Sequence, residues 1–269
     1  KSLKSKGDGN FDNTESLNSA AVKNQTGTLY FPKGNYLVKG EVNFSKDLSL
    51  KFENGAILIA EKAAVINIEC NIEAGKYQIF KGDGEFRTAK NLSVFPEWWG
   101  AMGNCEHDDS YAFQKALDAA EIIEVSAGKY LIADVKIPQG KHIEIKGAGF
   151  RNTSFYVKEN CAGFKYKREE NAKDLSVVFT NIEFTEKNAK RTATGIYFYG
   201  YGVHKDHNSV SVIDGRFYGL KYGMDIGYCG QCFFTRIDAR NNEVVYNLTR
   251  GASFIYINEG LAVGNGYYL

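Results

Sequence analysis

Acidic side chains recur at matching positions in the second half of the sequence. Aligning the short repeats after residue 170 places Glu183, Arg216, Asp238 and Asn258 at equivalent positions. Strands of neighbouring repeats stack about 4.8 Å apart, so Glu183 and Asp238 would flank Arg216. Their spacing suits the roughly 6.5 to 9.5 Å between the carboxyl groups of an inverting glycosidase. We therefore predict Glu183 and Asp238 as catalytic residues and Arg216 as a substrate-binding residue.

A second pair of carboxylates, Asp214 and Asp225, falls within a single repeat. Glycoside cleavage needs one carboxyl group to protonate the leaving oxygen and another to activate water or attack the anomeric carbon. Either pair supplies both groups, so all four residues are predicted catalytic candidates. The alternative is a set of ion pairs between neighbouring strands, which would produce the same alternation of Glu183, Arg216 and Asp238.

Aromatic and histidine residues gather beside these carboxylates. The segment 199–209, YGYGVHKDHNS, interrupts the repeats and holds two of the four histidines. Such loops often form one wall of a binding groove, and exposed tyrosines offer flat apolar faces to sugar rings. A solvated polar loop is the alternative. The predicted substrate-binding residues are Tyr197, Tyr199, Tyr201, His204 and His207.

β-Elimination is a second reaction open to this region. It requires a base, often Arg or Lys, beside a uronate, and Arg216, Arg236 and Arg240 are available. No cluster of acidic residues suggests a calcium site, and CGQC at 229–232 has no further Cys or His pair that would complete a zinc site. Five cysteines at irregular spacing also argue against a disulfide framework. We predict no metal and no cofactor, and favour hydrolysis over elimination.

The elements that carry these residues are predicted to be short strands. The sequence has 18 Phe, 17 Tyr and 28 Gly against 3 Pro and 2 Met, which favours strands and tight turns. Repeats of about 20 to 22 residues without a helical pattern indicate a solenoid, in which each repeat buries its apolar face on the next. The predicted inward residues are Phe198, Ile226, Leu248 and Leu269, and the outward ones are Tyr197, Asp225, Asn247 and Tyr268.

The first half of the sequence contains an internal repeat of one short segment. GDGNFDNTESLNSAA at 7–21 matches GNCEHDDSYAFQKALDAA at 103–120 at a constant offset. Each copy has a glycine turn, then polar residues that can accept hydrogen bonds from N–H groups at a helix start, then apolar residues at helical spacing. We predict a short helix in each copy, with Asp12, Asp108 and Asp109 in structural, not catalytic, roles.

The segment KGDGNFDNTESLNSA followed by LYFPKGNYLV resembles the opening module of the pectate-lyase superfamily of right-handed parallel β-helices. The stretch from Tyr77 to Asn104 resembles the join between two such modules, although Asn104 and Cys105 stand where the family usually has Asp and Gly. The resemblance implies an all-β, right-handed parallel β-helix with short helices at the start of two modules, residues 1–96 and 97–269.

Within that superfamily, the chain looks most like bacteriophage tailspikes and capsular polysaccharide depolymerases. This likeness implies a homotrimer on a virion tail, or a secreted protein, that cleaves a bacterial surface polysaccharide. The alternative is a non-catalytic β-helix that binds glycan or serves as a structural segment of a larger virion or secreted protein. Because the sequence stops at GYYL within a strand pattern, we expect the native chain to continue.

Charge and hydropathy exclude other partners. The formal net charge is +1, from 33 basic and 32 acidic residues without a basic run, which argues against nucleic acid. No apolar stretch approaches the roughly 20 residues of a membrane span. The aromatic pair in EWW, at 97–99, is predicted to pack in the core, with a sugar-stacking platform as the alternative.

Overall fold

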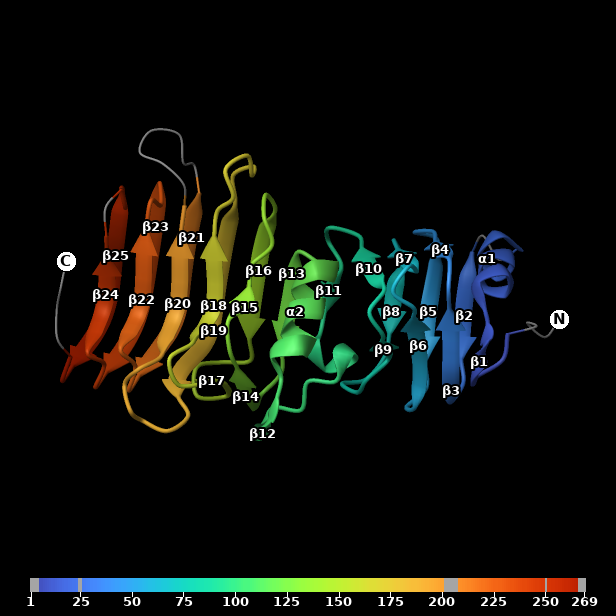
Figure 1. Cartoon of the computed structure of the whole chain (residues 1–269), viewed down its shortest axis with the longest axis horizontal. Coiled ribbons are helices and arrows are strands. Elements are labelled where there is room, and N and C mark those ends of the chain that lie inside the picture. Colours follow the sequence, from blue (N-terminus) through green and yellow to red (C-terminus); the bar gives the residue numbers. More distant parts are fainter. Residues whose placement is uncertain (1–4, 24–25, 201–207, 250, 266–269) are drawn as a thin grey trace. The chain divides into compact units, whose positions relative to one another are not determined.

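Parallel strands make up most of the described structure (Figure 1), so the predicted predominance of β structure is confirmed. The computed structural model describes residues 5–23, 26–200, 208–249 and 251–265. The chain divides into two compact units, formed by Lys1–Ala101 with Asp118–Glu121 and by Met102–Leu117 with Ile122–Leu269. The predicted module boundary between residues 96 and 97 stays a prediction.

In the first unit, most strands pair in parallel with the strand three places later in the chain. β2, β5 and β8 form one sheet, β3, β6 and β9 form a second together with β1, and β4, β7 and β10 form a third. The chain therefore passes through three sheets in turn. The elements are β1 Asp8–Asp12, α1 Thr14–Lys23, β2 Gly27–Phe31, β3 Gly34–Val38, β4 Glu41–Phe44, β5 Leu48–Phe52, β6 Ala56–Ala60, β7 Val65–Ile68, β8 Asn71–Glu73, β9 Phe80–Lys81, β10 Glu85–Thr88, β11 Ser93–Val94 and the 3-10 helix η1 Pro96–Trp99.

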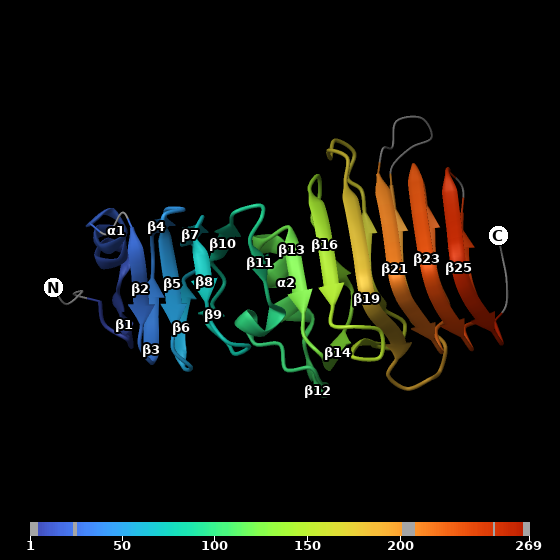
Figure 2. The same cartoon turned by 180° about the vertical axis from the view of Figure 1, so that it is seen from behind.

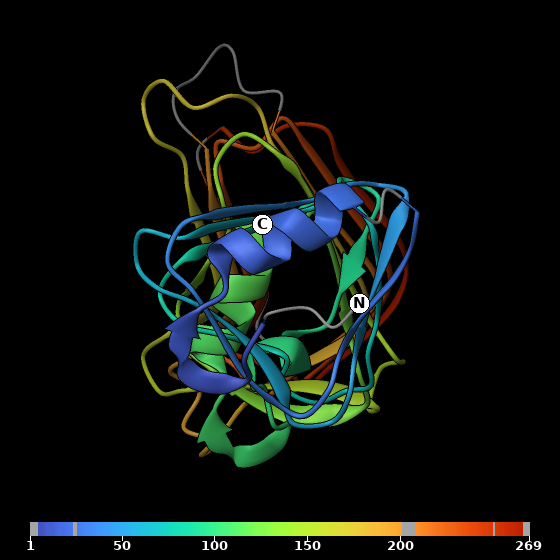
Figure 3. The same cartoon turned by 90° about the vertical axis from the view of Figure 1, so that its right-hand side faces the viewer.

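Helix α1 runs across one end of these sheets (Figure 3). Its apolar face, which includes Leu17 and Ala20, is buried. On the same helix, the Asn18 side chain donates to the carbonyl of Glu41 at 2.7 Å and accepts from the N–H of Asn43 at 3.2 Å. The helix thus satisfies backbone groups of β4 that would otherwise lack a strand partner.

The second unit contains one branched sheet and one simple sheet. In the branched sheet, the long strand β19 pairs with both β16 and β17, and β21, β23 and β25 then follow in order (Figure 2). The simple sheet has the order β15, β18, β20, β22, β24. The elements are β12 Asn104–Asp108, α2 Ser110–Ala119, β13 Ile122–Val125, β14 Gly128–Ile132, β15 Val135–Lys136, β16 His142–Gly147, β17 Thr153–Val157, β18 Ala162–Lys167, β19 Ser176–Glu186, β20 Thr194–Tyr199, β21 Ser209–Tyr218, β22 Tyr222–Gly227, β23 Gln231–Arg240, β24 Val244–Leu248 and β25 Ile255–Val263.

Each long strand of the second unit bends at one residue with left-handed dihedrals. These residues are Asn181, Asp214, Arg236 and Glu259, with φ values of 58°, 55°, 53° and 52°. The parallel register continues on both sides of the bend. Left-handed dihedrals are uncommon outside Gly, Asn and Asp. The neighbouring strands therefore impose this conformation on Arg236 and Glu259.

Inward side chains form columns of stacked aromatic rings. The rings of Phe184 and Phe217, on β19 and β21, are stacked with centroids 5.4 Å apart, and those of Tyr166 and Phe198 lie 4.7 Å apart. The predicted alternation is confirmed on β20 and β22, where Phe198 and Ile226 are fully buried. The residues next to them in sequence, Tyr197 and Asp225, are half-buried, as are Asn247 and the predicted inward Leu248; Tyr268 and Leu269 lie outside the described residues.

Trp98 and Trp99 pack in the core of the first unit, as predicted. Both are almost fully buried. The Trp98 indole N–H donates to the carbonyl of Gly75 at 3.1 Å, and the Trp99 ring centroid lies 5.0 Å from that of Phe80. Neither tryptophan can serve as an exposed platform for a sugar ring.

The CGQC segment is buried within the second unit. Cys229 and Cys232 are both fully buried, and Cys229 Sγ donates to the carbonyl of Gln231 at 3.2 Å. The neighbouring Cys229 thiol and burial raise the pKa of Cys232. A thiol with a raised pKa is a poor nucleophile. No disulfide joins any of the five cysteines, all of which lie in the described part of the chain. No helix among the described residues has the length and hydrophobicity of a membrane span.

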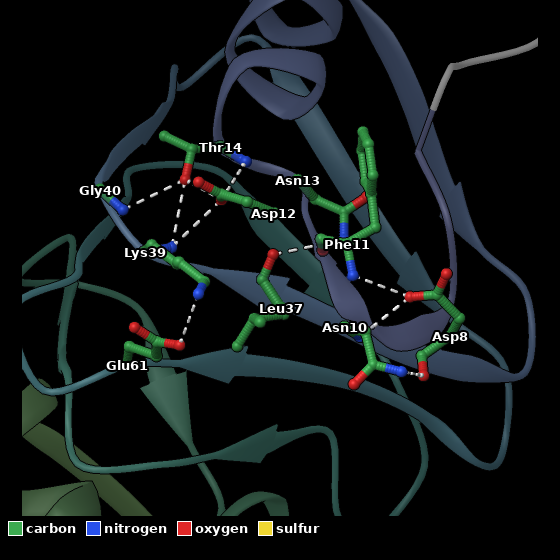
Figure 4. A network of polar contacts seen from close by, with 10 residues as sticks. All are labelled: Asp8, Asn10, Phe11, Asp12, Asn13, Thr14, Leu37, Lys39, Gly40 and Glu61. Carbon is green, nitrogen blue, oxygen red and sulfur yellow. Dashed lines mark hydrogen bonds and ion pairs between the residues drawn. The ribbon is translucent and has the colours of Figure 1, made fainter.

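Both copies of the repeated segment begin with the same turn. In the first copy, Asp8 Oδ1 accepts hydrogen bonds from the backbone N–H groups two and three residues ahead, both at 2.9 Å (Figure 4). In the second copy, Asn104 Oδ1 accepts the equivalent bonds at 3.0 and 2.9 Å. The amide of Asn104 thus supplies the same acceptor as the carboxylate of Asp8.

The aspartate four residues after this turn residue caps the helix, as predicted for Asp12 and Asp108. Asp12 Oδ1 accepts from the N–H of Thr14 at 3.0 Å and from its hydroxyl at 2.6 Å (Figure 4). Asp108 makes the same two bonds with Ser110, at 3.1 and 2.6 Å. In the second copy, Lys158 adds an ion pair to the cap. These hydrogen bonds lower the pKa of both carboxyl groups against the opposing effect of desolvation.

The residue just before each helix is fully buried and differs between the copies. The Asn13 side-chain nitrogen donates to three backbone carbonyls at 2.9 to 3.2 Å, and its oxygen accepts from the N–H of Lys6. Asp109 instead accepts from the N–H groups of Met102 at 2.8 Å and Gly103 at 3.2 Å. Burial raises the pKa of Asp109. Asp109 therefore has a structural role, as predicted.

Candidate functional site

The predicted column of Glu183, Arg216 and Asp238 is present in the branched sheet. The strand register pairs Glu183 with Arg216 and Arg216 with Asp238. The prediction for Asn258 is wrong, because Leu261 follows Asp238 in this column and Asn258 pairs with Thr235. By register, β22 and β24 pair at an offset of 22 residues, as in Ile226 with Leu248, and β23 and β25 pair at an offset of 23, as in Cys232 with Ile255. The predicted position of Asn258, 20 residues after Asp238, is three residues short of this register.

Side chains of this column form a continuous set of ion pairs. Arg216 Nη1 lies 2.5 Å from Glu183 Oε1, and Arg216 Nε lies 3.4 Å from Asp238 Oδ2. The remaining oxygens are also engaged, by the Ser154 hydroxyl at 2.9 Å from Glu183 Oε2 and by Arg240 Nε at 2.7 Å from Asp238 Oδ1. The guanidinium of Arg216 thus stands between the two carboxylates that were predicted to act together. Their catalytic role stays a prediction.

Asp214 and Asp225 lie on different sheets of the second unit, on β21 and β22. Asp214 occupies the left-handed bend of β21, where both of its oxygens face Arg236, at 2.5 Å from Nε and 2.7 Å from Nη2. These hydrogen bonds lower the pKa of Asp214. Asp225 has a separate set of partners, so the structure does not show the two carboxylates as one acid–base pair.

Asp225 is held by neutral donors. Its Oδ1 atom accepts from the hydroxyl of Tyr199 at 2.8 Å and from the amide of Asn247 at 2.9 Å. The hydroxyl of Thr249 donates to that of Tyr199 at 3.0 Å. Among the described residues, no hydrogen bond or ion pair engages Asp225 Oδ2. Of the four predicted catalytic carboxylates, Asp225 therefore has the one oxygen that is left open by the described chain.

Two tyrosines border this carboxylate. The rings of Tyr197 and Tyr199 are stacked, with centroids 4.5 Å apart and planes at 21°. The Tyr199 ring lies over Gly227, where a Cβ atom would come within 2.5 Å of a ring carbon. Lys165 Nζ lies 5.7 Å from the Tyr197 centroid on the neighbouring strand. Glycine at 227 thus allows Tyr199 to reach Asp225.

The Tyr199 hydroxyl is a permanent donor to Asp225. Burial and the nearby carboxylate raise the pKa of Tyr199 to about 12. The hydroxyl therefore keeps its proton at neutral pH, and its proton orients Asp225 Oδ1. Among the described residues, Asp225 is in this way fixed by neutral donors, in contrast to Glu183, Asp214 and Asp238, which contact arginines.

Sequence analysis missed two members of this cluster. Asn247 was assigned to the outward column of Asp225 but to no site, and Thr249 was not considered. The signal was available, because Tyr199, Gly227 and Thr249 each lie two residues after a member of that column. The predicted binding residues Tyr201, His204 and His207 lie outside the described residues.

Neither elimination nor metal binding gains support from the described residues. Arg216, Arg236 and Arg240 each contact a carboxylate, and hydrogen bonding to Asp214 raises the pKa of Arg236. A guanidinium held in this way keeps its proton and cannot act as a base. Within the described part of the chain, no group of three His, Cys, Asp or Glu side chains could hold a metal ion.

Comparisons with protein-family models, curated proteins and solved structures found no match to this chain. The resemblance to the pectate-lyase superfamily therefore rests on the sequence motifs alone. The structure shows that the described chain is mainly built of parallel strands, which pair from one repeat to the next.

Proposed function

We propose that the protein is a right-handed parallel β-helix that binds a polysaccharide on the outward face of β20, β22 and β24. The passage of the chain through three sheets in turn supports the fold. The observation that carries the function is the open Oδ2 atom of Asp225, beside the stacked Tyr197 and Tyr199.

Sugar chains present many hydroxyl groups along a regular repeat. A carboxylate that lacks a cation accepts strong, charge-assisted hydrogen bonds from such hydroxyls. Asp225 is already oriented through its other oxygen, so little ordering entropy is lost when a sugar binds. Tyr197 and Asn247 pair with Asp225 on the adjacent strands, about 4.8 Å to either side, and extend the surface along the stack.

Binding is favoured over cleavage at this face because the described residues give Asp225 no second carboxyl group as a partner. Hydrolysis of a glycoside needs a second carboxyl group. The partners that the structure gives to Asp225 are a tyrosine hydroxyl and an amide. Among the predicted functions, the non-catalytic glycan-binding alternative is thus the better supported.

Binding to immobilised capsular polysaccharides from a panel of bacteria tests this proposal. Asp225→Ala should weaken binding at least about tenfold, the loss of one charge-assisted hydrogen bond of 1.4 kcal/mol or more. Asp47→Ala provides the control, since Asp47 is exposed in a turn of the first unit. Equal binding by both variants, or no binding across the panel by the parent protein, would contradict the proposal.

Polysaccharide cleavage is the second candidate function, supported by the position of Glu183 and Asp238 two strands apart in one column. New reducing ends without absorbance from unsaturated uronates would indicate a glycoside hydrolase, and both signals together a lyase. Glu183→Gln and Asp238→Asn should then each abolish cleavage. This same proposal includes three further properties: action on a bacterial surface, a virion-tail or secreted location, and a homotrimeric assembly.

A further inference from the structure

Two tyrosines stand on the outward face of the branched sheet. Tyr156 on β17 pairs with Thr185 on β19, and Thr185 pairs with Tyr218 on β21. Tyr218 is 38% exposed and Tyr156 is half-buried, whereas the preceding residues, Phe155 and Phe217, are fully buried. Since neighbouring strands lie about 4.8 Å apart, the two tyrosines are about 9.6 Å apart along the stack. The shorter side chain of Thr185 lies between them.

A cation lies over one face of each tyrosine ring. Lys129 Nζ is 6.0 Å from the centroid of Tyr156. Arg216 Cζ is 5.2 Å from the centroid of Tyr218. Both cations belong to the column of paired residues that contains Glu183. The two rings are thus approached from the same side, and their opposite faces are turned the same way.

Ion pairs hold the Tyr218 ring in place. Arg216 contacts Glu183 and Asp238 on the adjacent strands, so its guanidinium is fixed, and cation–π attraction keeps the ring over it. Among the described residues, no other aromatic ring packs on Tyr156 or Tyr218. A ring that is oriented before binding loses little entropy when a ligand stacks on it.

The arrangement of the two rings fits a particular class of polysaccharide. Aromatic rings bind the flat apolar faces of sugar rings. In an extended β-1,4-linked chain every second sugar presents the same face, and two sugars together span about two strand spacings. Tyr156 and Tyr218 therefore match the first and third sugars of such a chain, with the second sugar above Thr185. An α-1,4-linked chain coils and does not repeat in this way.

We propose that Tyr156 and Tyr218 form a stacking platform for an extended, β-1,4-linked polysaccharide that runs across β17, β19 and β21. The hydroxyl of Thr185 supplies a hydrogen-bond donor and acceptor to the middle sugar. This inference rests on the proposed binding of a polysaccharide, but it concerns a second site, on a different sheet from Asp225. It also commits to a linkage, which the Asp225 cluster does not.

Isothermal titration calorimetry with cellohexaose and maltohexaose tests the platform, because these two glucose hexamers differ only in linkage. We expect the parent protein to bind cellohexaose at least about tenfold more tightly than maltohexaose. Tyr156→Ala and Tyr218→Ala should each weaken cellohexaose binding by about threefold to tenfold, the loss of one stacked ring. Tyr30→Ala is the matched control and should bind as the parent does, since Tyr30 is an exposed tyrosine on a strand of the first unit.

The spacing of the rings is tested with chain length. Cellotriose reaches both rings and cellobiose only one, so the parent protein should bind cellotriose at least about threefold more tightly. In Tyr218→Ala the two sugars should bind equally, whereas Tyr218→Phe keeps the ring and should keep the difference. Asp225→Ala should also keep the difference, because Asp225 is not part of this platform.

These outcomes separate the platform from the site at Asp225. No binding of cellohexaose, equal binding of the two hexamers, or unchanged affinity in both tyrosine-to-alanine variants would overturn the platform. If Asp225→Ala still weakened binding to a capsular polysaccharide in that case, the proposed function would stand without the second site. If no capsular polysaccharide bound but the preference for cellotriose held, the platform would stand and the role of Asp225 would be refuted.

Discussion

The two copies of the helix-capping segment hold the same backbone with different buried side chains. Asn13 both donates and accepts, because three carbonyls and one N–H group surround it. Asp109 only accepts, because two N–H groups face it. The difference shows that the repeated motif specifies a turn and a helix start, while the buried group matches the donors and acceptors around it.

Exchanging the amide of the first copy for a carboxylate should have the largest effect. Asn13→Asp would direct a negative charge at three carbonyl oxygens in a fully buried position. We expect the free energy of unfolding to fall by about 3 kcal/mol or more at pH 7, the cost of buried groups without partners. Urea unfolding measures it. If Asn13→Asp lowered the free energy of unfolding by less than Asp109→Asn does, the buried side chains would not be matched to the donors and acceptors around them.

The reverse exchange should be milder. Asp109→Asn keeps one oxygen acceptor and removes a buried charge, but its nitrogen would face an N–H group in place of an acceptor. We expect a loss of about 1 kcal/mol in the free energy of unfolding at pH 7, the net value of one hydrogen bond. The same urea titration provides the measurement, and a loss above about 3 kcal/mol would indicate that Asp109 also has contacts beyond these two bonds.

Removing the helix caps should affect the copies to nearly the same extent. Asp12→Ala and Asp108→Ala each delete an acceptor for the first helical N–H group, which costs about 1 kcal/mol. Asp108 also has the partly exposed ion pair with Lys158, which adds at most a few tenths of a kcal/mol. Thermal unfolding at low and high salt should separate the two, since the Asp108 variant loses the ion pair with Lys158, whereas Asp12 has a minor coulombic interaction with Lys39.

Acid should change the cost of these substitutions in opposite directions. The pKa of Asp108 is lowered from 3.8, so its contribution to stability is present above that value and is lost as the pH falls through its folded-state pKa. The pKa of Asp109 is raised from 3.8, so its contribution is present below that value and is lost as the pH rises through its folded-state pKa.

The cost of Asp108→Ala should therefore shrink between pH 6 and pH 3, whereas the cost of Asp109→Asn should grow. Urea unfolding of both variants and the parent protein across this range tests the contrast. Parallel curves for the two variants would show that burial does not dominate at Asp109. Each of these pH-dependent changes is a fraction of the stability cost of the substitution at neutral pH. They are therefore the smallest of the expected effects.

Patterns in the sequence predicted the features that depend on backbone periodicity. Both capped helices, the inward Phe198 and Ile226 and the column from Glu183 to Asp238 follow from spacing alone. Asn258 was misplaced because the length of the connection before β25 leaves no mark on the alternation of the strand, so the register of β25 against β23 could not be read from the sequence.

The partners of individual side chains could not be predicted in the same way. Whether a carboxylate meets Arg216 or the hydroxyl of Tyr199 depends on rotamers and on the exact register of adjacent strands. The open oxygen of Asp225 follows from such details, including a glycine at 227 that leaves space for a ring. The spacing of residues thus located the candidates, and only side-chain geometry separated Asp225 from the others.

Pairing between successive repeats also has a consequence for how the chain folds. Residues that face each other in the sheets are close in sequence, as with Leu29 and Leu50 on β2 and β5 or Phe234 and Ile257 on β23 and β25. Short loops of this kind are closed at a small entropic cost. We therefore expect each unit to acquire structure progressively during synthesis, every new repeat being templated by the one already formed, without waiting for the opposite end of the chain.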